Sequence, residues 1–237
     1  MSDSFYFRQL LAGRDFAVGN DIARQMLNFA YAIGDRETGE AILVDPSYHP
    51  TELVEIVEAD GLKVVGVIAT HFHADHIGGD LMGYEIPGIA ELLQHRNVPI
   101  HVQTTEVAWV TKGTGVEVVN LVQHESHDIL KVGKYEIEFI HTPGHTPGSQ
   151  CMLVNNCLIS GDTLFVDGCG RTDFPYSQPE EMYISLNERL AGIKDEVVLY
   201  PGHLYSAERH APMGEVRKNN FVLAPVSKEQ WLAMFAR

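Results

Sequence analysis

The sequence predicts a layered fold in which helices pack on β-sheets, and three observations indicate this class. Apolar positions recur along the chain with a period of about two residues in some segments and about 3.6 in others, as in strands and helices. Several short apolar runs end in segments rich in glycine and proline, where strands commonly stop. With 237 residues, 45% of them hydrophobic and 21% charged, the chain can bury a full core. We therefore expect a single domain over residues 1–237.

The first half of the chain begins with a hairpin pattern. Apolar runs at 28–33 and 40–44 are joined by the turn-forming segment 34–39. Residues 50–60 then predict an amphipathic helix, which a following glycine ends. The nearly unbroken apolar run 64–69 is typical of a strand that is buried on both faces.

The second half continues the alternation of helices and strands that is expected when helices lie on sheets. The predicted elements are, in order, a helix at 88–96, strands at 99–103, 135–141, 151–154 and 158–160, a helix at 179–190 and a strand at 196–200.

Charge and cysteine content exclude several classes of protein. The net charge of −15 and the isoelectric point of about 5.1 argue against nucleic acid as a partner, because a phosphate backbone requires an excess of lysine and arginine. No apolar run approaches 18 residues and no uninterrupted apolar segment lies near the start, so we expect neither secretion nor a membrane partner. Three cysteines without a C-x-x-C pair favour a reducing, cytoplasmic location.

Four potential metal ligands lie within six residues directly after the apolar run 64–69. They are His71, His73, Asp75 and His76. Imidazole and carboxylate groups suit zinc and other borderline divalent metals. A loop that follows a buried strand is a common place for an active site in layered proteins, because such loops can bring ligands together.

Three further loops after predicted strands each carry one strong ligand. These ligands are His145, Asp162 and His203, and each has a glycine as its immediate chain neighbour. Glycine tolerates positive φ angles and a close approach of the backbone, which a crowded set of ligands requires.

Together these residues form the pattern H-x-H-x-D-H, followed in order by a histidine, an aspartate and a final histidine. In this pattern the chain resembles the metallo-β-lactamase superfamily over most of its length. The resemblance implies an α+β fold, a four-layer αββα sandwich with the metals along one edge. It implies a first metal site made by His71, His73 and His145, a second made by Asp75, His76 and His203, and Asp162 as a bridge between them.

The ligand set indicates hydrolytic chemistry. Two cations about 3.5–4 Å apart can share a water, lower its pKa to about 7 and direct a metal-bridging hydroxide at a carbonyl group. We expect two divalent metal ions, with Zn²⁺ favoured over Fe²⁺ or Mn²⁺. As a monodentate ligand Asp75 keeps one oxygen free, and we expect this catalytic carboxylate to orient the hydroxide.

The segments 161–171, 181–183 and 200–206 resemble the glyoxalase II branch, which hydrolyses the thioester of S-D-lactoylglutathione. That resemblance implies that Arg171 lies near the glutathione moiety and Tyr205 near its peptide backbone. We therefore expect a thioesterase that acts on a small substrate such as an acyl-glutathione. A structural alternative for Arg171 is an ion pair with Asp173.

Two departures leave alternatives open. Only 34 residues follow His203, too few for the full helical domain of the longer glyoxalase II enzymes. The run 170–174 is more similar to the persulfide dioxygenase branch, which binds a single Fe²⁺ through residues that match His71, His145 and Asp162. A mononuclear iron dioxygenase is thus one alternative, with a thiol-derived substrate, and a lactone or other ester hydrolase is another.

The remaining candidate residues have ordinary structural interpretations. Cys169 is predicted to be a packed thiol. Residues 80–88 form either a pocket wall or a surface loop, and with Trp109 they could contact another subunit in a homo-oligomer. The other histidines are predicted to be ordinary polar residues, with His141 close enough to the His145 loop to support it: His49, His95, His101, His124, His127, His141 and His210.

Overall fold

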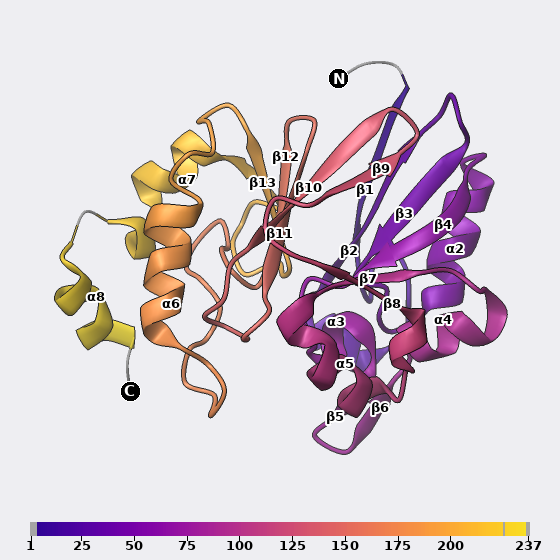
Figure 1. Cartoon of the computed structure of the whole chain (residues 1–237), viewed down its shortest axis with the longest axis horizontal. Helices are drawn as coiled ribbons and strands as arrows, with labels where there is room; N and C mark the ends of the chain where they lie inside the picture. Colours follow the sequence, from indigo (N-terminus) through magenta and orange to yellow (C-terminus); the bar gives the residue numbers. More distant parts are fainter. Residues whose placement is uncertain (1–3, 225, 236–237) are drawn as a thin grey trace.

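The computed structural model describes residues 4–224 and 226–235, and it shows two six-stranded sheets between two outer layers of helices (Figure 1). This confirms the predicted α+β fold and its αββα layers. The first sheet contains, in spatial order, β1 (Phe5–Leu11), β2 (Phe29–Asp35), β3 (Glu40–Val44), β4 (Lys63–Ile68), β7 (Ile100–Gln103) and β8 (Leu121–His124). The second contains β14 (Ala211–Pro212), β13 (Val198–Pro201), β12 (Cys157–Gly161), β11 (Gln150–Val154), β10 (Tyr135–His141) and β9 (Ile129–Val132).

Each sheet carries its own set of helices on the outer face. The first sheet is covered by α1 (Asp21–Met26), α2 (Pro50–Ala59), α3 (Ala74–Ile77), α4 (Ile89–His95) and α5 (Val107–Thr114). The second is covered by α6 (Pro179–Ile184), which continues as a π-helical turn η3 (Ser185–Arg189), and by α7 (Met213–Asn219) and α8 (Lys228–Phe235). Short 3₁₀ turns lie at η1 (Thr104–Glu106), η2 (Val118–Asn120) and η4 (Phe221–Leu223).

One hydrophobic core lies between the inner faces of the two sheets, and a second lies between the first sheet and its helices. The core between the sheets includes Phe29 and Ile33 from the first sheet and Phe139, Met152 and Ile159 from the second, all buried. Alternate residues of each strand point to the opposite face, where they pack under the helices. The strand β4 contributes to both cores, which confirms that it is buried on both faces.

The predicted elements agree with the structure to within two residues at most boundaries. The predicted helix at 179–190 is α6 followed by the π-helical turn, and the predicted strand at 196–200 is β13, which starts two residues later. The strand β1 was not predicted, because Arg8 and Gln9 interrupt its apolar residues and only its two ends are buried. The helices α1, α3, α5, α7 and α8 and the strands β8, β9 and β14 were also not predicted.

The segment at 80–88 is ordered as a β-hairpin rather than a plain surface loop. Its strands β5 (Gly79–Leu81) and β6 (Tyr84–Ile86) pair through a two-residue turn, Met82-Gly83. Both turn residues have positive φ, 53° and 88°, as a type I′ hairpin turn requires. The hairpin extends from the helical side of the first sheet, at the lower edge of Figure 1.

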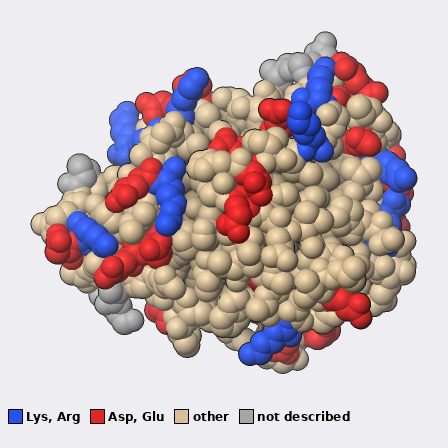
Figure 2. All heavy atoms as spheres, in the orientation of Figure 1, with Lys and Arg blue, Asp and Glu red and all other residues tan. Residues whose placement is uncertain are grey.

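The surface is acidic and of mixed charge. On the face drawn in Figure 2, lysine and arginine side chains lie apart from one another, most of them beside acidic groups. Within the described part of the chain, the structure contains no helix with the length and apolar character needed to span a membrane.

Candidate metal centre and active site

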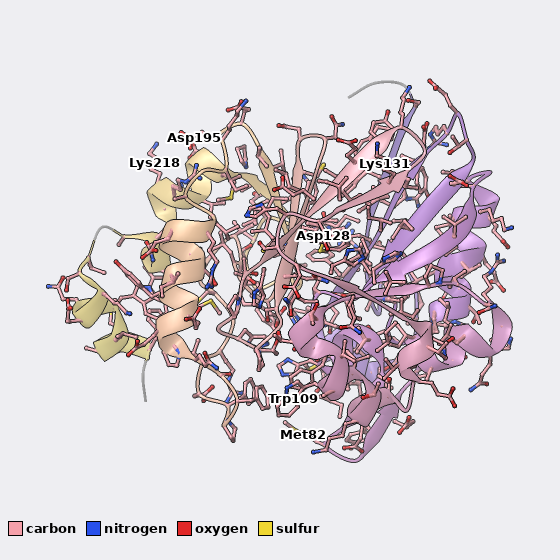
Figure 3. The ribbon with its side chains drawn as sticks, viewed as in Figure 1. Met82, Trp109, Asp128, Lys131, Asp195 and Lys218 are labelled. Atoms are coloured by element: carbon pink, nitrogen blue, oxygen red, sulfur yellow. The ribbon has the colours of Figure 1, made fainter. Side chains whose placement is uncertain are left out.

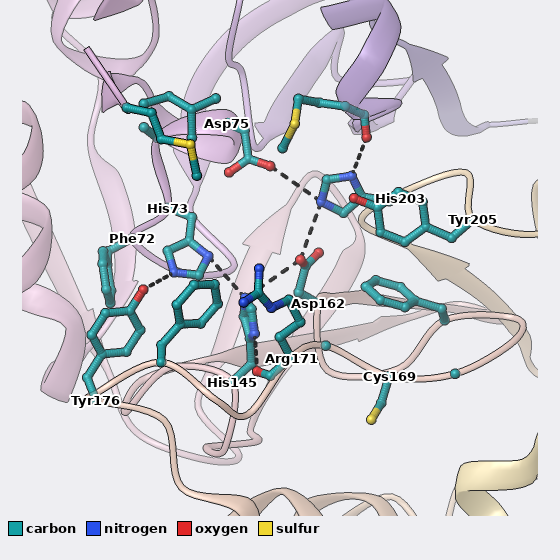
Figure 4. Close-up of a pocket in the computed structure, with 18 of the residues that line it drawn as sticks. Phe72, His73, Asp75, His145, Asp162, Cys169, Arg171, Tyr176, His203 and Tyr205 are labelled. Atoms are coloured by element: carbon teal, nitrogen blue, oxygen red, sulfur yellow. Dashed lines mark hydrogen bonds and ion pairs between the residues drawn. The ribbon is translucent and has the colours of Figure 1, made fainter. Parts of the chain in front are cut away.

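The seven predicted ligands meet at one edge of the sandwich, although four separate segments carry them. These segments follow β4, β10, β12 and β13, and all four strands end at this edge. The cluster after β4 was predicted to lie in a loop, but Asp75 and His76 lie on the short helix α3. The ligand atoms fall into three overlapping groups in which all atoms lie within 4.8 Å of one another: a first group of His71, His73 and His145, a second group of Asp75, His76 and His203, and a linking group of His71, His76 and Asp162. Figure 4 shows five of the seven around a cavity.

The first group has its three ring nitrogens facing one point. His73 Nδ1 lies 3.0 Å from both His71 Nε2 and His145 Nε2. Burial lowers the pKa of His71 well below its usual value, lowers the pKa of His145 and lowers that of His73 to about 3. The three rings therefore stay neutral, and neutral imidazole is the form that binds a metal.

The other nitrogen of each ring in this group is held by a hydrogen-bonding partner. The partners are the Thr70 hydroxyl for His71 at 2.9 Å, the Tyr176 hydroxyl for His73 at 2.7 Å and the Arg171 carbonyl for His145 at 2.8 Å. Such contacts fix the ring orientation and select the tautomer that presents a lone pair to a metal.

The second group is equally complete. His76 Nε2 and His203 Nε2 are 3.1 Å apart, and Asp75 Oδ2 lies 3.6 Å and 3.4 Å from them. On their far sides, His76 Nδ1 donates to Asp45 Oδ2 at 2.9 Å and His203 Nδ1 donates to the Met26 carbonyl at 2.7 Å. These partners leave both Nε2 atoms free for a metal.

Asp162 lies between the two groups. Its Oδ2 is 3.6 Å from His145 Nε2 and 3.3 Å from His203 Nε2, and its Oδ1 is 3.3 Å from His76 Nε2. Burial alone would raise the pKa of Asp162, but the rings of His203 and His76 hold it well below its usual range. Asp162 Oδ1 is buried and has no hydrogen bond among the described residues. A buried carboxylate oxygen that accepts no hydrogen bond is costly, so this donor set fits divalent cations.

Asn28 supports the second group and was not predicted from the sequence. Its Nδ2 donates to Asp75 Oδ2 at 3.0 Å and lies 3.3 Å and 3.4 Å from the Nε2 atoms of His76 and His203. The Tyr48 hydroxyl donates to Asn28 Oδ1 at 2.9 Å, so the amide NH₂ faces the ligands. The one feature of the sequence that could have indicated Asn28 is its position as a polar residue directly before the apolar strand β2.

Glu106 joins two of the ligand loops and was also not predicted. Its buried carboxylate accepts hydrogen bonds from the Phe72 backbone N–H at 3.1 Å, the Thr146 hydroxyl at 2.6 Å and the Gly148 backbone N–H at 3.0 Å. Phe72 belongs to the first ligand segment, whereas Thr146 and Gly148 follow His145 within its own turn. Burial raises the pKa of Glu106 to about 7.

A cavity of about 750 Å³ opens above the ligands. Its lining includes His73, Asp75, His145, Asp162 and His203, so any metal held there faces the cavity. This position fits an active site in which a substrate reaches the metals directly.

The two predicted substrate-binding residues, Arg171 and Tyr205, line this cavity. Arg171 donates two hydrogen bonds of 2.9 Å to the carboxylate of Asp173 and lies 4.6 Å from the ring centre of Phe174. The ion pair that was the structural alternative for Arg171 is therefore present. Tyr205 stacks on the His203 ring, with the ring centres 4.5 Å apart.

Three other predictions can be compared with the structure. Cys169 lines the cavity, and burial raises the pKa of its thiol to about 12, as expected for a packed thiol. His141 donates to the Pro147 carbonyl at 2.9 Å and so supports the His145 loop, as predicted. Trp109, which was predicted as a possible contact with another subunit, stacks on the ring of Phe72 with the ring centres 5.0 Å apart.

Comparisons with known proteins agree with this geometry. The probable polyketide biosynthesis zinc-dependent hydrolase BaeB of Bacillus velezensis is 30% identical over 206 residues, which cover 86% of this chain and 85% of that protein. The human mitochondrial persulfide dioxygenase ETHE1 is 28% identical over 90% of this chain and 80% of its own. A hydroxyacylglutathione hydrolase of Polaromonas is 34% identical over 75% of this chain and 62% of that protein.

Among solved structures, ETHE1 from Myxococcus xanthus superposes with a TM-score of 0.78 at 27% identity, covering 98% of this chain and 90% of that one. The sequence model of the metallo-beta-lactamase superfamily matches residues 25–203, the span from just before β2 to the last predicted ligand. The chain therefore belongs to the metallo-beta-lactamase superfamily, whose metal-dependent enzymes include hydrolases and a dioxygenase.

Proposed function

We propose that this protein is a binuclear metallohydrolase that acts on a thioester or a similar small-molecule acyl substrate, such as an acyl-glutathione. The observation that carries the proposal is that both ligand groups are complete and that Asp162 lies between them, with its Oδ1 buried and without a hydrogen bond among the described residues. We assign His71, His73 and His145 to a first metal and Asp75, His76 and His203 to a second. Zinc is the metal that we favour, because histidine, a preferred zinc ligand, supplies three of the four ligands at the first site and two of the four at the second.

When bound, two such ions supply a water that is activated at neutral pH and polarise the substrate carbonyl. Hydrolysis joins the oxygen of water to the carbonyl carbon and breaks the carbon–sulfur bond, which yields a carboxylic acid and a thiol. We assign Arg171 and Tyr205 to the thiol-bearing part of the substrate, since both line the cavity beside the ligands.

We assign to Asp75 the orientation of the attacking water. Its side chain lines the cavity, and the hydrogen bond from Asn28 holds its Oδ2 toward His76 and His203. Replacing Asp75 by Asn should lower kcat at least about a hundredfold, as expected for the loss of a positioned base. An Asp75→Asn enzyme that holds two metals and keeps the full rate would refute this role.

A second candidate is a mononuclear iron persulfide dioxygenase. It is favoured by the similarity to human ETHE1 over 90% of this chain and by the sequence 170–174, whose Arg171 and Asp173 are paired in the structure. In that enzyme class His71, His145 and Asp162 would hold one iron. Hydrolysis of a lactone or another ester would use the same two-metal site as the thioesterase.

Metal content separates the two candidates. Elemental analysis of protein purified without added metal should find two zinc ions per chain, together with hydrolysis of an acyl-glutathione. One iron per chain, with O₂ consumption on glutathione persulfide, would overturn the hydrolase.

We also propose a cytoplasmic location and a small-molecule substrate without nucleic-acid or membrane partners. The three cysteines are unpaired in the structure, which agrees with a reducing compartment. The separated basic side chains in Figure 2 offer no phosphate-binding stripe on that face. Fractionation of cells followed by immunoblotting tests the location.

A further inference from the structure

We infer that the acyl group of the substrate is bulky, apolar and uncharged, and that it binds between the ligand cluster and the β5–β6 hairpin. This inference rests on the proposed hydrolase function and specifies its substrate class. It follows from the size of the cavity, the nature of its walls and the charges that line it.

The cavity is large for a small polar acyl group. Its volume of about 750 Å³ lies within the range of about 300–1,000 Å³ that is usual for sites that enclose a drug-sized ligand. Beside the thiol-bearing part that we assign to Arg171 and Tyr205, a lactoyl group, with only five non-hydrogen atoms beyond the sulfur, would leave the remaining volume to water. A longer acyl chain would displace that water from apolar surface, which is favourable.

One wall is aromatic and stands beside the first ligand group. Phe174 and Tyr176 are stacked with ring centres 5.4 Å apart, and Phe72 meets Tyr176 edge-on at 5.0 Å. Phe174 also lies edge-on to the ligand His73 at 5.4 Å. An apolar group attached to a carbonyl at the ligand cluster would therefore contact this wall directly (Figure 4).

Apolar side chains at the mouth of the cavity are exposed. Phe221 is 55% exposed, and Met82, at the tip of the β5–β6 hairpin, is 92% exposed. Figure 3 shows Met82 at the lower end of the molecule, on that hairpin. Exposed apolar side chains that cluster around one opening indicate a binding surface, whereas singly scattered ones do not.

The charges in the lining disfavour an anionic acyl group. Apart from the ligands, the charged lining residues among those described are Asp80, Asp167 and Arg171. The guanidinium of Arg171 is matched by the carboxylate of Asp173. Besides any metal ions that the ligands hold, a carboxylate at the end of the acyl chain would thus lose its water and meet two aspartates and no unpaired cationic side chain in the described lining.

The first experiment measures kcat/KM for thioesters of one uncharged thiol, N-acetylcysteamine, with acetyl, butanoyl, hexanoyl and adipoyl groups. We expect kcat/KM to rise up to about fourfold for each added methylene, the equivalent of about 0.8 kcal/mol. The adipoyl ester, which matches the hexanoyl chain but ends in a carboxylate, should be at least about tenfold slower. A flat or falling series, or an adipoyl ester as fast as the hexanoyl ester, would overturn the inference.

The second experiment tests the hairpin with a matched pair of variants. Met82→Asn keeps the turn, because Asn-Gly is a preferred type I′ sequence, and removes the apolar side chain. It should lower the ratio of hexanoyl to acetyl kcat/KM several-fold. Tyr84→Asn changes an exposed apolar residue on β6 that is absent from the cavity lining, and this control should leave the ratio unchanged. If the ratio is the same in both variants and in the unmodified enzyme, the acyl group does not contact the β5–β6 hairpin and the inference is overturned.

A binding measurement distinguishes failure of this inference from failure of the proposed function. The probes are S-ethyl and S-hexyl thioethers of N-acetylcysteamine, which cannot be hydrolysed, titrated by calorimetry into the metal-loaded protein. Tighter binding of the S-hexyl probe without turnover of any thioester would support the inference and reject the hydrolase. Turnover of the thioesters with equal binding of both probes would support the hydrolase and reject the inference.

Discussion

At the scale of single residues, the groups behind the predicted ligands determine how those ligands are held. Each of the five predicted histidine ligands has its second nitrogen engaged, by a hydroxyl, a carbonyl or a carboxylate. Asp75 is held in the same way by Asn28, whose amide is in turn fixed by Tyr48. Loss of such a supporting contact typically weakens metal binding by about 10–100-fold.

We predict that Asn28→Leu lowers occupancy of the second site. The variant removes the donor to Asp75 Oδ2 and leaves the first-group ligands unchanged. Metal content after dialysis should fall from two ions per chain toward one, as measured by elemental analysis. Tyr48→Phe, which keeps Asn28 but removes the hydroxyl that orients it, should show a smaller loss. Full retention of two ions in Asn28→Leu would contradict the role assigned to the amide.

At the scale of elements, the short turn η1 and the helix α8 both support the site without contributing a predicted ligand. Through Glu106, η1 joins the first ligand loop to the turn that carries His145. Helix α8 packs Trp231 into the core between the second sheet and its helices. Its Phe235 carbonyl accepts a hydrogen bond from the hydroxyl of Thr172, which follows Arg171 in the loop beside the cavity. The positions of the loops therefore depend on both elements.

Glu106 should make stability depend on pH. Because burial raises its pKa from 4.5 to about 7, ionisation is less favourable in the folded protein than in the unfolded chain. Its contribution to the free energy of unfolding therefore falls as pH rises from about 4.5 to about 7, by about 3 kcal/mol in all, and is constant above that. Urea unfolding of the metal-free protein and of Glu106→Gln from pH 5 to pH 8 should give a difference curve with this slope. Parallel curves for the two proteins would show that Glu106 does not titrate in this range.

Helix α8 should be required for stability. Trp231 is fully buried and its indole N–H donates to the Val222 carbonyl at 3.0 Å. Trp231→Ala should lower the free energy of unfolding by about 3–5 kcal/mol, because it leaves a cavity in the core and an unpaired carbonyl. Met234→Ala, on the same helix but 46% exposed, is the control and should cost little. Chemical denaturation measures both, and similar small losses would show that α8 is only loosely attached.

At the scale of the whole molecule, the two stacked sheets bring ligand loops from residues 71 to 203 to one edge. The first sheet supplies the loop after β4 and the second supplies the loops after β10, β12 and β13. Metal ions bound there would link the two sheets. Binding to the folded state alone stabilises a protein, by about 4 kcal/mol when free metal is a thousandfold above the dissociation constant.

Removal of metal by a chelator should therefore lower Tm by on the order of 10 °C, since 1 kcal/mol corresponds to about 2–4 °C in a chain of this size. Differential scanning calorimetry of the loaded and the chelated protein measures the shift. A single transition in both samples is expected if residues 1–237 form one domain, as predicted. An unchanged Tm would show that the cluster binds no metal strongly, and two separate transitions would contradict the single domain.

The sequence by itself determined most elements of the two sheets and the order of the predicted ligands. Strand and helix periods are local properties, so runs such as 64–69 and 135–141 could be placed from their own residues. The ligand pattern could be identified because four of its residues, His71 to His76, lie together and the others follow strand ends.

Only the tertiary structure revealed the supporting residues and the character of the cavity. Asn28 lies 47 residues from Asp75 along the chain, and Glu106 lies 40 residues from Thr146, yet each pair is hydrogen-bonded. The aromatic wall likewise joins Phe72 to Phe174 and Tyr176 across about a hundred residues. No local pattern encodes such contacts, because they form only when the packing of two sheets brings distant loops to the same edge.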